Sequence, residues 1–340
     1  MGPRIKIAVF ICGALLLAFI LYSRSDYCKC KARINYDQIH INDDIDLDTL
    51  YKPADSIEIN RIYRYWDNFS IKSDDYVIVN KSAYYQGRML LIVRHQINEQ
   101  KHYGAILFPE DFDETKSYPL LLWANGLDQS NPSVDIRNLG SIYMRMKSYF
   151  IVIPSFRGQS LVANGHRYCS DGFFGDAFDG ATDDALRLLE VAKTECKGVD
   201  LERVVVGGVS RGGTVALLMG IRNPNINAVI SIAGPTNFFS KEMYYRFPKQ
   251  YKYQFLSKKL PLSSIREKMI KSSPIHFVER YQNHMLLIHG KNDKIVPVSH
   301  AYDVIDKLKN KKSFQYHIVN EGHTVHYETE NILSWLKKYN

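Results

Sequence analysis

The stretch Val204–Gly213 holds the residues with the clearest chemical potential. It reads Val-Val-Val-Gly-Gly-Val-Ser-Arg-Gly-Gly, so the pattern G-x-S-x-G centres on Ser210. A buried strand is predicted before the serine and a helix after it, which places Ser210 on a sharp turn with its hydroxyl exposed. Side chains at Gly208 and Gly212 would clash across such a turn. The pattern predicts a nucleophilic serine; the alternative is a glycine-rich phosphate loop or a plain turn.

A serine hydroxyl needs a base to take its proton, and a histidine oriented by a carboxylate serves this role. In a strand–turn–helix setting the chain order is serine, acid, histidine, with the last two on loops after later strands. Asp293 follows the predicted strand Met285–His289, and His323 follows the predicted strand Phe314–Val319. Both come just past the carboxyl ends of their strands, where side chains converge. The predicted triad is therefore Ser210, Asp293 and His323.

Other residues near the predicted acid and base compete for these roles. His326 lies close to His323, but Gly322 favours a tight turn at His323. His289 ends a predicted strand, and we interpret it as structural. Two later acids, Asp303 and Asp306, fall on the following helix, too far along the chain.

The tetrahedral intermediate of acyl transfer needs two hydrogen-bond donors for its oxyanion. The backbone N–H of Arg211, next to the nucleophile, is the first predicted donor. The second is expected from the loop after the strand Leu120–Trp123, with the backbone of Leu127 as first choice and Gly126 as second. A plain turn at this Asn-Gly pair is the alternative. This chemistry needs no cofactor and no metal ion, and the sequence contains no metal-binding pattern.

The elements that position these residues follow from the hydrophobic pattern. Early strands without helices precede a region in which strands and helices alternate, and the middle strands are continuous apolar runs, as for strands buried on both faces. This order predicts a mostly parallel sheet with an antiparallel N-terminal edge and helices on both faces. The other predicted strands are Tyr76–Asn80, Met89–Val93, Ala105–Phe108, Phe150–Ile153, Val204–Val209 and Ala228–Ile232. The predicted helices are Asp176–Ala192, Arg211–Ile221, Pro297–Lys309 and Ile332–Lys338.

Composition restricts the class of protein. A chain of 340 residues with 45% hydrophobic and 24% charged residues is globular, which excludes disordered, collagen-like and disulfide-dense classes. The net charge of +8 is modest and does not indicate a nucleic-acid partner. A bridge between Cys169 and Cys196 is not expected, because they flank a predicted helix. Neither cysteine usage nor composition indicates the compartment or the oligomeric state.

The N-terminus carries one long apolar run, Ile7–Tyr22, behind Arg4 and Lys6. Its length lies between that of a secretory signal core and that of a membrane-spanning helix. We favour an uncleaved membrane anchor in residues 1–25 over a removed signal peptide. The catalytic domain is then expected outside the cytoplasm (periplasmic, lumenal or extracellular), or secreted if the segment is cleaved. Residues 26–75 are expected to form a juxtamembrane linker, and residues 76–340 the catalytic domain.

The motifs together resemble the α/β-hydrolase superfamily and, within it, the catalytic domain of the prolyl oligopeptidase family. The resemblance covers about residues 85–338 and implies the same triad acting through an acyl-enzyme. Two departures matter: the residues before the domain are too few for the family's β-propeller, and Ala124 stands where many members have an oxyanion tyrosine. The supporting segments are Pro154–Gly158, Phe178–Asp183, Gly208–Gly213, Ser273–Ile275, His289–Pro297 and Glu321–His323.

The segment Thr236–Gln282, which we call the insert, interrupts the alternation of strands and helices. It contains ten Lys/Arg against three Glu, together with ten aromatic residues. Because such segments commonly overlie the site in this fold, we expect a cap above Ser210. Its charge suggests either selection of anionic substrates or docking on an anionic membrane; the alternative is a solvated helical surface. The lysines considered are Lys249, Lys252, Lys258 and Lys259.

These observations lead to one functional prediction. The chain is expected to be a serine hydrolase that cleaves a peptide or ester bond, with a peptide slightly favoured. A carboxylesterase of the same fold is the nearest alternative. A non-catalytic, membrane-tethered binding domain is the alternative of another class, against which the intact triad argues.

Overall fold

The computed structural model describes residues 34–36, 45–73, 75–97, 99–127, 132–138, 145–239, 241–246, 248–258, 260–326 and 329–339. The apolar run at residues 7–22 and Lys259 lie outside the described residues. Across the described part of the chain, no helix combines the length and apolar character needed to cross a membrane.

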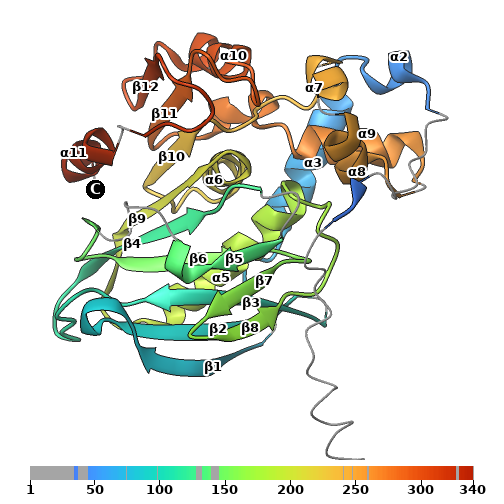
Figure 1. Ribbon diagram of the computed structural model, residues 1–340. Coiled ribbons are helices and arrows are strands. Elements are labelled where there is room, and N and C mark those ends of the chain that lie inside the picture. The colour runs from blue at the N-terminus through green and yellow to red at the C-terminus, as the bar shows by residue number, and fades with distance from the viewer. Residues whose placement is uncertain are drawn as a thin grey trace, which may run out of the picture.

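A mixed sheet forms the centre of the molecule (Figure 1). Within the described residues it has nine strands in the order β1-β2-β3-β6-β4-β9-β10-β11-β12. The first four in this order pair antiparallel, and the rest, from β6 to β12, pair parallel. This confirms the predicted parallel sheet with an antiparallel N-terminal edge. The strands are β1 (Tyr76–Ala83), β2 (Met89–Ile97), β3 (Gln100–Leu107), β4 (Tyr118–Ala124), β6 (Phe150–Ser155), β9 (Val199–Val209), β10 (Ala228–Ile232), β11 (His284–Gly290) and β12 (Phe314–Val319).

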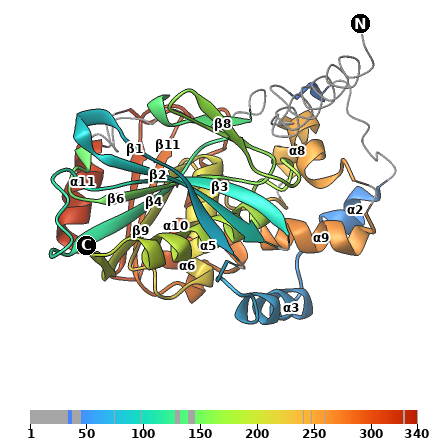
Figure 2. The same ribbon diagram turned by 90° about the horizontal axis from the view of Figure 1, so that it is seen from below.

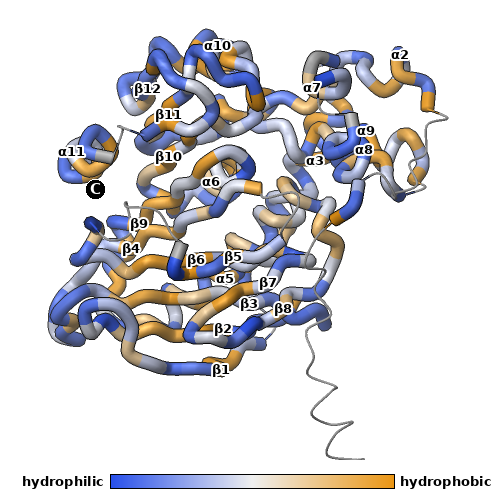
Figure 3. The backbone as a smooth tube through the Cα atoms, viewed as in Figure 1, coloured by the Kyte–Doolittle hydropathy of each residue, from blue (hydrophilic) through white to orange (hydrophobic). Residues whose placement is uncertain are grey.

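The central strands are apolar on both faces because both faces are covered. In β4 every residue is buried, with Leu120 and Leu122 in one core and Leu121 and Trp123 in the other. Alternate side chains of a strand point to opposite faces, so one apolar run supplies two cores. Figure 3 shows the resulting hydrophobic band through the middle of the sheet.

Different elements cover the two faces of the sheet (Figure 2). On one face, four helices share a single core with the strands: α3 (Ser56–Asp67), α5 (Asp179–Glu195), α6 (Arg211–Arg222) and α10 (Ser299–Leu308). On the other face, α11 (Thr329–Tyr339) packs together with a small second sheet. That sheet, which the sequence did not predict, consists of β5 (Ser133–Asp135), β7 (Ser160–Ala163) and β8 (His166–Cys169). Short 3-10 turns lie at η2 (Tyr85–Gly87) and η3 (Ile136–Asn138).

The segment before β1 packs on the domain in its later half. Asp55 caps α3 with a reciprocal capping box to Glu58, and Trp66 at the end of α3 is only 4% exposed. The rings of Trp66 and Phe277 pack edge to face, with their centroids 4.5 Å apart. Glu58 also accepts hydrogen bonds from Arg266 of the insert, at 2.8 and 2.9 Å. Residues 45–73, which were expected to belong to a linker, therefore form part of the folded body.

The insert is helical and has a small core of its own. It comprises α7 (Lys241–Arg246), α8 (Pro248–Phe255), α9 (Leu262–Lys271), η4 (Pro274–His276) and η5 (Val278–Arg280). Figure 1 shows α7, α8 and α9 together at one end of the sheet, beside α2 (Leu47–Leu50). Their shared core includes Leu50, Phe238, Tyr251, Phe255 and Met269.

Candidate active site

Ser210 occupies the turn between β9 and α6 in a strained conformation. Its φ of 55° and ψ of −120° lie in a region that residues with a side chain rarely adopt. The backbone N–H of Ser210 donates to the carbonyl of Ile232 at 2.8 Å, which holds the turn against β10. A Cβ atom at Gly208 would lie 2.4 Å from the carbonyl oxygen of Ala124, and one at Gly212 only 1.9 Å from it. The turn therefore requires both predicted glycines.

Asp293 and His323 meet at the carboxyl edge of the sheet. The Nδ1 atom of His323 lies 2.7 Å from Oδ2 of Asp293. The other carboxylate oxygen, Oδ1, accepts the backbone N–H groups of Ile295 at 2.7 Å and Val296 at 2.8 Å. A proton on Nδ1 that faces the carboxylate leaves Nε2 of the neutral imidazole as a proton acceptor. This is the arrangement that a general base needs.

The surroundings of Asp293 keep it ionised. Burial alone would raise the pKa of Asp293, but hydrogen bonds from His289, His323 and the N–H of Val296 lower it to well below its ordinary value. His289 is fully buried in β11, with Nε2 3.0 Å from the carbonyl oxygen of Val296 and 3.4 Å from Oδ2 of Asp293. His289 thus supports the acid from behind, which agrees with its interpretation as a structural residue.

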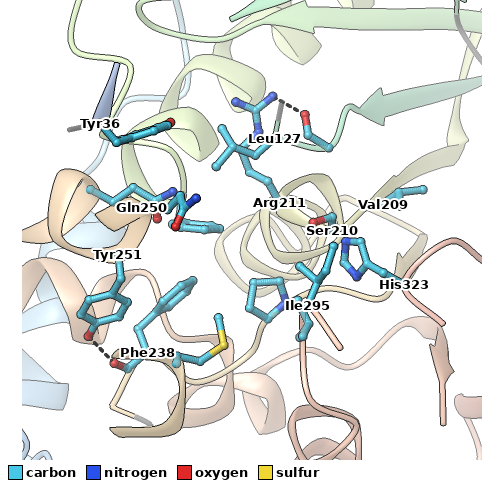
Figure 4. A pocket seen from close by; sticks show the side chains of 16 residues that line it. Tyr36, Leu127, Val209, Ser210, Arg211, Phe238, Gln250, Tyr251, Ile295 and His323 are labelled. Atoms are coloured by element: carbon cyan, nitrogen blue, oxygen red, sulfur yellow. Dashed lines mark hydrogen bonds between the residues drawn. The ribbon is translucent and has the colours of Figure 1, made fainter. Parts of the chain in front are cut away.

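Ser210 and His323 line one pocket of about 860 Å³ (Figure 4). Asp293 is 6% exposed and does not line the pocket. It can therefore act on a bound substrate only by way of His323. Among the described residues no hydrogen bond joins Ser210 to His323. Such contacts are often long in unliganded hydrolases and tighten when substrate binds.

The predicted oxyanion donors belong to residues that line the same pocket as the serine. Gly126, Leu127 and Arg211 all line the pocket. The loop approaches closely, because a Cβ atom on Gly126 would lie 3.8 Å from Cβ of Ser210. In the part of the chain that the structure describes, neither the N–H of Leu127 nor that of Arg211 donates to another group. Both N–H groups are therefore available to a substrate oxygen.

The loop that carries His323 depends on a different glycine from the one expected. Gly322 was expected to provide a tight turn, but its φ is not left-handed and an added Cβ would meet nothing within 4 Å, so the backbone does not require a glycine there. The glycine that the loop needs is Gly290, where a Cβ would lie 2.0 Å from the carbonyl oxygen of Gly322. The competitor His326 has a side chain that is 68% exposed and does not line the pocket.

The insert forms one wall of the pocket. Its lining side chains are mostly apolar, together with two carboxamides, and comprise Phe238, Met243, Gln250, Tyr251 and Gln254. Sequence reasoning missed the two glutamines, because nothing in their spacing distinguishes a lining residue from a surface residue. Of the alternatives for the charge of the insert, direct contact with a substrate in this pocket does not fit Lys249, Lys252 or Lys258, none of which lines it. Lys258 instead lies over the ring of Phe173, 4.3 Å from its centroid.

Comparison with known proteins identifies the family. The model of the prolyl oligopeptidase family matches residues 139–340. The chain belongs to this family. Dipeptidyl-peptidase 5 of Porphyromonas gingivalis is 25% identical over 228 residues, which are 65% of this chain and 32% of that protein. The chain thus spans about a third of the length of that curated relative. The resemblance predicted from the motifs is confirmed.

Solved structures show the same fold. Acetyl xylan esterase 1 from Thermoanaerobacterium sp. superposes with a TM-score of 0.62 at 16% identity, over 87% of this chain and 100% of that one. A putative dipeptidyl aminopeptidase IV from Bacteroides ovatus gives a TM-score of 0.59 at 17% identity, over 75% of this chain and 36% of that one. The predicted α/β-hydrolase fold is confirmed.

Proposed function

We propose that the protein cleaves a peptide or ester bond through an acyl-enzyme formed on Ser210. Oγ of Ser210 attacks the carbonyl carbon while His323 takes the hydroxyl proton and then gives it to the leaving group. Asp293 holds the imidazole and stabilises its charged form. The N–H groups of Arg211 and Leu127 bind the oxyanion, and water then hydrolyses the acyl-enzyme. The observation that carries this proposal is the 2.7 Å contact between Asp293 and His323 beside the pocket of Ser210.

The test is covalent labelling with a fluorophosphonate probe, followed by mapping of the modified peptide. We expect one adduct, on Ser210, and loss of both labelling and ester hydrolysis in Ser210→Ala, by on the order of 10⁴-fold or more. Ser263→Ala, at an exposed position on α9, is the matched control and should behave as wild type. An adduct on another serine, or an active Ser210→Ala, would refute the assignment.

Two carboxamides support a peptide-like acyl group over a simple one. Gln250 and Gln254 lie one turn apart on α8, so their side chains share a face of the helix. Gln254 is only 7% exposed, yet its side-chain amide has no hydrogen-bond partner among the described residues. A carboxamide both donates and accepts, as a peptide group does, so Gln254 can pair with an amide of the substrate. The apolar wall of Phe238, Met243 and Tyr251 fits a neutral acyl group, which an esterase would also accept.

Two p-nitrophenyl esters of similar length distinguish these substrates. One carries an N-acetylaminoacyl group, which contains an amide, and the other carries a straight alkanoyl group. In Gln254→Met, kcat/KM should fall about 2- to 10-fold for the amide-bearing ester, as one neutral hydrogen bond is lost, and stay unchanged for the alkanoyl ester. Gln282→Met, at an exposed position outside the pocket, is the control. An equal fall in kcat/KM for both esters would show that Gln254 only packs in the pocket wall and does not bind the amide of the substrate.

We also propose that residues 1–25 tether the protein to a membrane, with the catalytic domain outside the cytoplasm. The basic and then apolar N-terminus supports this. A further support is that Cys169 is disulfide-bonded, because disulfides persist in oxidising compartments. Cys196 is a free, buried thiol. Protease treatment and cell fractionation test the proposal: digestion of the domain only after the cytoplasm itself is opened would contradict a location outside it, and recovery of the protein in the soluble fraction would contradict a tether.

A further inference from the structure

Arg211, the residue after the nucleophile, buries a cation beside the active site. Its side chain is 2% exposed at the start of α6. Buried arginines usually pair with a carboxylate. Within the described residues the guanidinium of Arg211 makes no ion pair, and Asp184 contributes only a more distant charge. Burial lowers the pKa of Arg211 to about 9, which still leaves it protonated at neutral pH.

The guanidinium is held by neutral oxygens, two of them in the loop that follows β4. Nε and Nη2 each donate to the carbonyl oxygen of Asn125 at 3.2 Å, and Nη2 also donates to that of Gly126 at 3.0 Å (Figure 4). A further contact joins Nη2 to Oε1 of Gln159 at 3.3 Å. The guanidinium carbon lies 4.6 Å from the ring centroid of Phe156, which packs the cation from one side. These contacts fix the cation and the loop relative to each other.

The bond to Gly126 also controls the next residue. The carbonyl of Gly126 and the N–H of Leu127 belong to one peptide unit, which is planar, and no cis peptide bond occurs in the described residues. Fixing the oxygen of this unit therefore fixes the direction of its N–H. A cation bound to the carbonyl also polarises the unit and strengthens the N–H as a donor. The backbone N–H of Arg211 is itself the other predicted donor.

We propose that Arg211 is a positioning residue for the oxyanion hole. Its guanidinium aims the N–H of Leu127 at the substrate oxygen while its own backbone N–H supplies the second donor. This inference rests on the proposed function, because it gives a role to the oxyanion donors of that mechanism. It also gives the variable residue of the G-x-S-x-G pattern a specific task in this chain: coupling the loop 124–127 to the nucleophile.

Arg211→Met tests the proposal because methionine keeps an apolar stem and the backbone N–H but removes every guanidinium donor. We expect kcat for a p-nitrophenyl ester to fall about 10²- to 10³-fold, as when one oxyanion donor is lost, with KM changed less than about threefold. Affinity for an alkyl boronic acid, whose serine adduct is tetrahedral, should fall in parallel with kcat. Affinity for the carboxylic acid product, which makes no such adduct, should stay unchanged.

Arg211→Lys keeps a charge at this position but cannot bridge two carbonyls with a planar fork. It should recover part of kcat and of boronate affinity relative to Arg211→Met, and it serves as the test if the methionine variant does not fold. Parallel losses of boronate and product affinity would show a packing role and overturn the proposal. So would kcat within threefold of wild type in a folded variant. The proposed function fails separately, if wild-type protein is not labelled at Ser210 by a fluorophosphonate.

Discussion

Oδ2 of Asp293 lies 2.7 Å from Nδ1 of His323 although 30 residues separate the two along the chain. The sheet explains this proximity, because β11 and β12 are parallel neighbours with Gly290 opposite Val319. The loops that follow are tied together by the N–H of Asn292, which donates to the carbonyl of Glu321 at 2.9 Å. The register of two strands thus sets the geometry of the acid and the proposed base.

Asp293→Asn should lower kcat by on the order of 10⁴-fold with little change in KM. The amide has no charge to stabilise the imidazolium, and its NH₂ group disfavours the tautomer with a proton on Nδ1. Steady-state hydrolysis of a p-nitrophenyl ester measures the effect. Asp303→Asn, at an exposed position on α10, is the control and should keep full activity. If the Asp293→Asn protein kept a kcat near that of wild type, another residue would have to be the acid of the triad.

Stability should fall in mild acid because several histidines are buried in neutral form. Burial lowers the pKa of His95 to about 3 and that of His300 to about 4. An unfolded chain protonates these residues near pH 6.5, whereas the folded chain does not. The free energy of unfolding should therefore decrease as the pH falls from about 6.5 towards 4, by up to ~1.4 kcal/mol per pH unit for each histidine.

Urea denaturation between pH 7.5 and 4.5 measures this slope. His95→Gln removes one of the buried titrating groups, so its stability should depend less steeply on pH than that of wild type. His166→Gln changes an exposed histidine and should leave the slope unchanged. The same slope in all three proteins would show that His95 does not contribute.

The positions of most strands along the chain and the candidate triad could be predicted from the sequence because each depends on a local pattern. Strands such as β4 are continuous apolar runs bounded by polar residues, and they are buried on both faces. Ser210, Asp293 and His323 each follow a predicted strand directly. In a parallel sheet the carboxyl ends of neighbouring strands share one edge, so local patterns alone bring these residues together.

Features that depend on distant contacts could not be predicted in this way. The strands of the second sheet are short, and β5 has only three residues. The packing of α3 depends on Trp66 meeting Phe277, more than 200 positions later, which no local pattern indicates. The direction of each lysine and glutamine in the insert depends on how its helices rest on the domain. Composition indicated that the insert is unusual, but it could not indicate which of its side chains line the pocket.

Reversing the charge of the insert should leave substrate selection unchanged. Lys249, Lys252 and Lys258 do not line the pocket, so their charges act on a substrate only from a distance, through solvent that contains salt. When all three become glutamate, KM should therefore change by less than about twofold. The measurement compares a p-nitrophenyl ester with an anionic acyl group and a neutral ester of similar length. A selective rise in KM for the anionic ester would show that these lysines do recognise anionic substrates.

The same variant also tests the membrane-docking hypothesis. Loss of binding to phosphatidylserine vesicles would support that hypothesis, and unchanged binding would contradict it.

Gly212→Ala and Gly322→Ala form a matched pair that tests the geometry of the site. A Cβ at Gly212 would lie 1.9 Å from the carbonyl oxygen of Ala124, so the loop that carries Leu127 must shift. We expect this overpacking to lower the free energy of unfolding by about 1–3 kcal/mol. It should also lower kcat by about 10²-fold or more, through misplacement of the oxyanion donor.

Gly322→Ala adds the same methyl group next to the proposed base, where nothing lies within 4 Å and φ is not left-handed. Stability should therefore stay within about 0.5 kcal/mol of wild type, with full activity. Urea denaturation and ester hydrolysis of the two variants in parallel decide the matter. If Gly322→Ala were as damaging as Gly212→Ala, the histidine loop would have to close on the site more tightly than the structure shows. If Gly212→Ala were harmless, the loop after β4 would be too adaptable to hold an oxyanion donor in place.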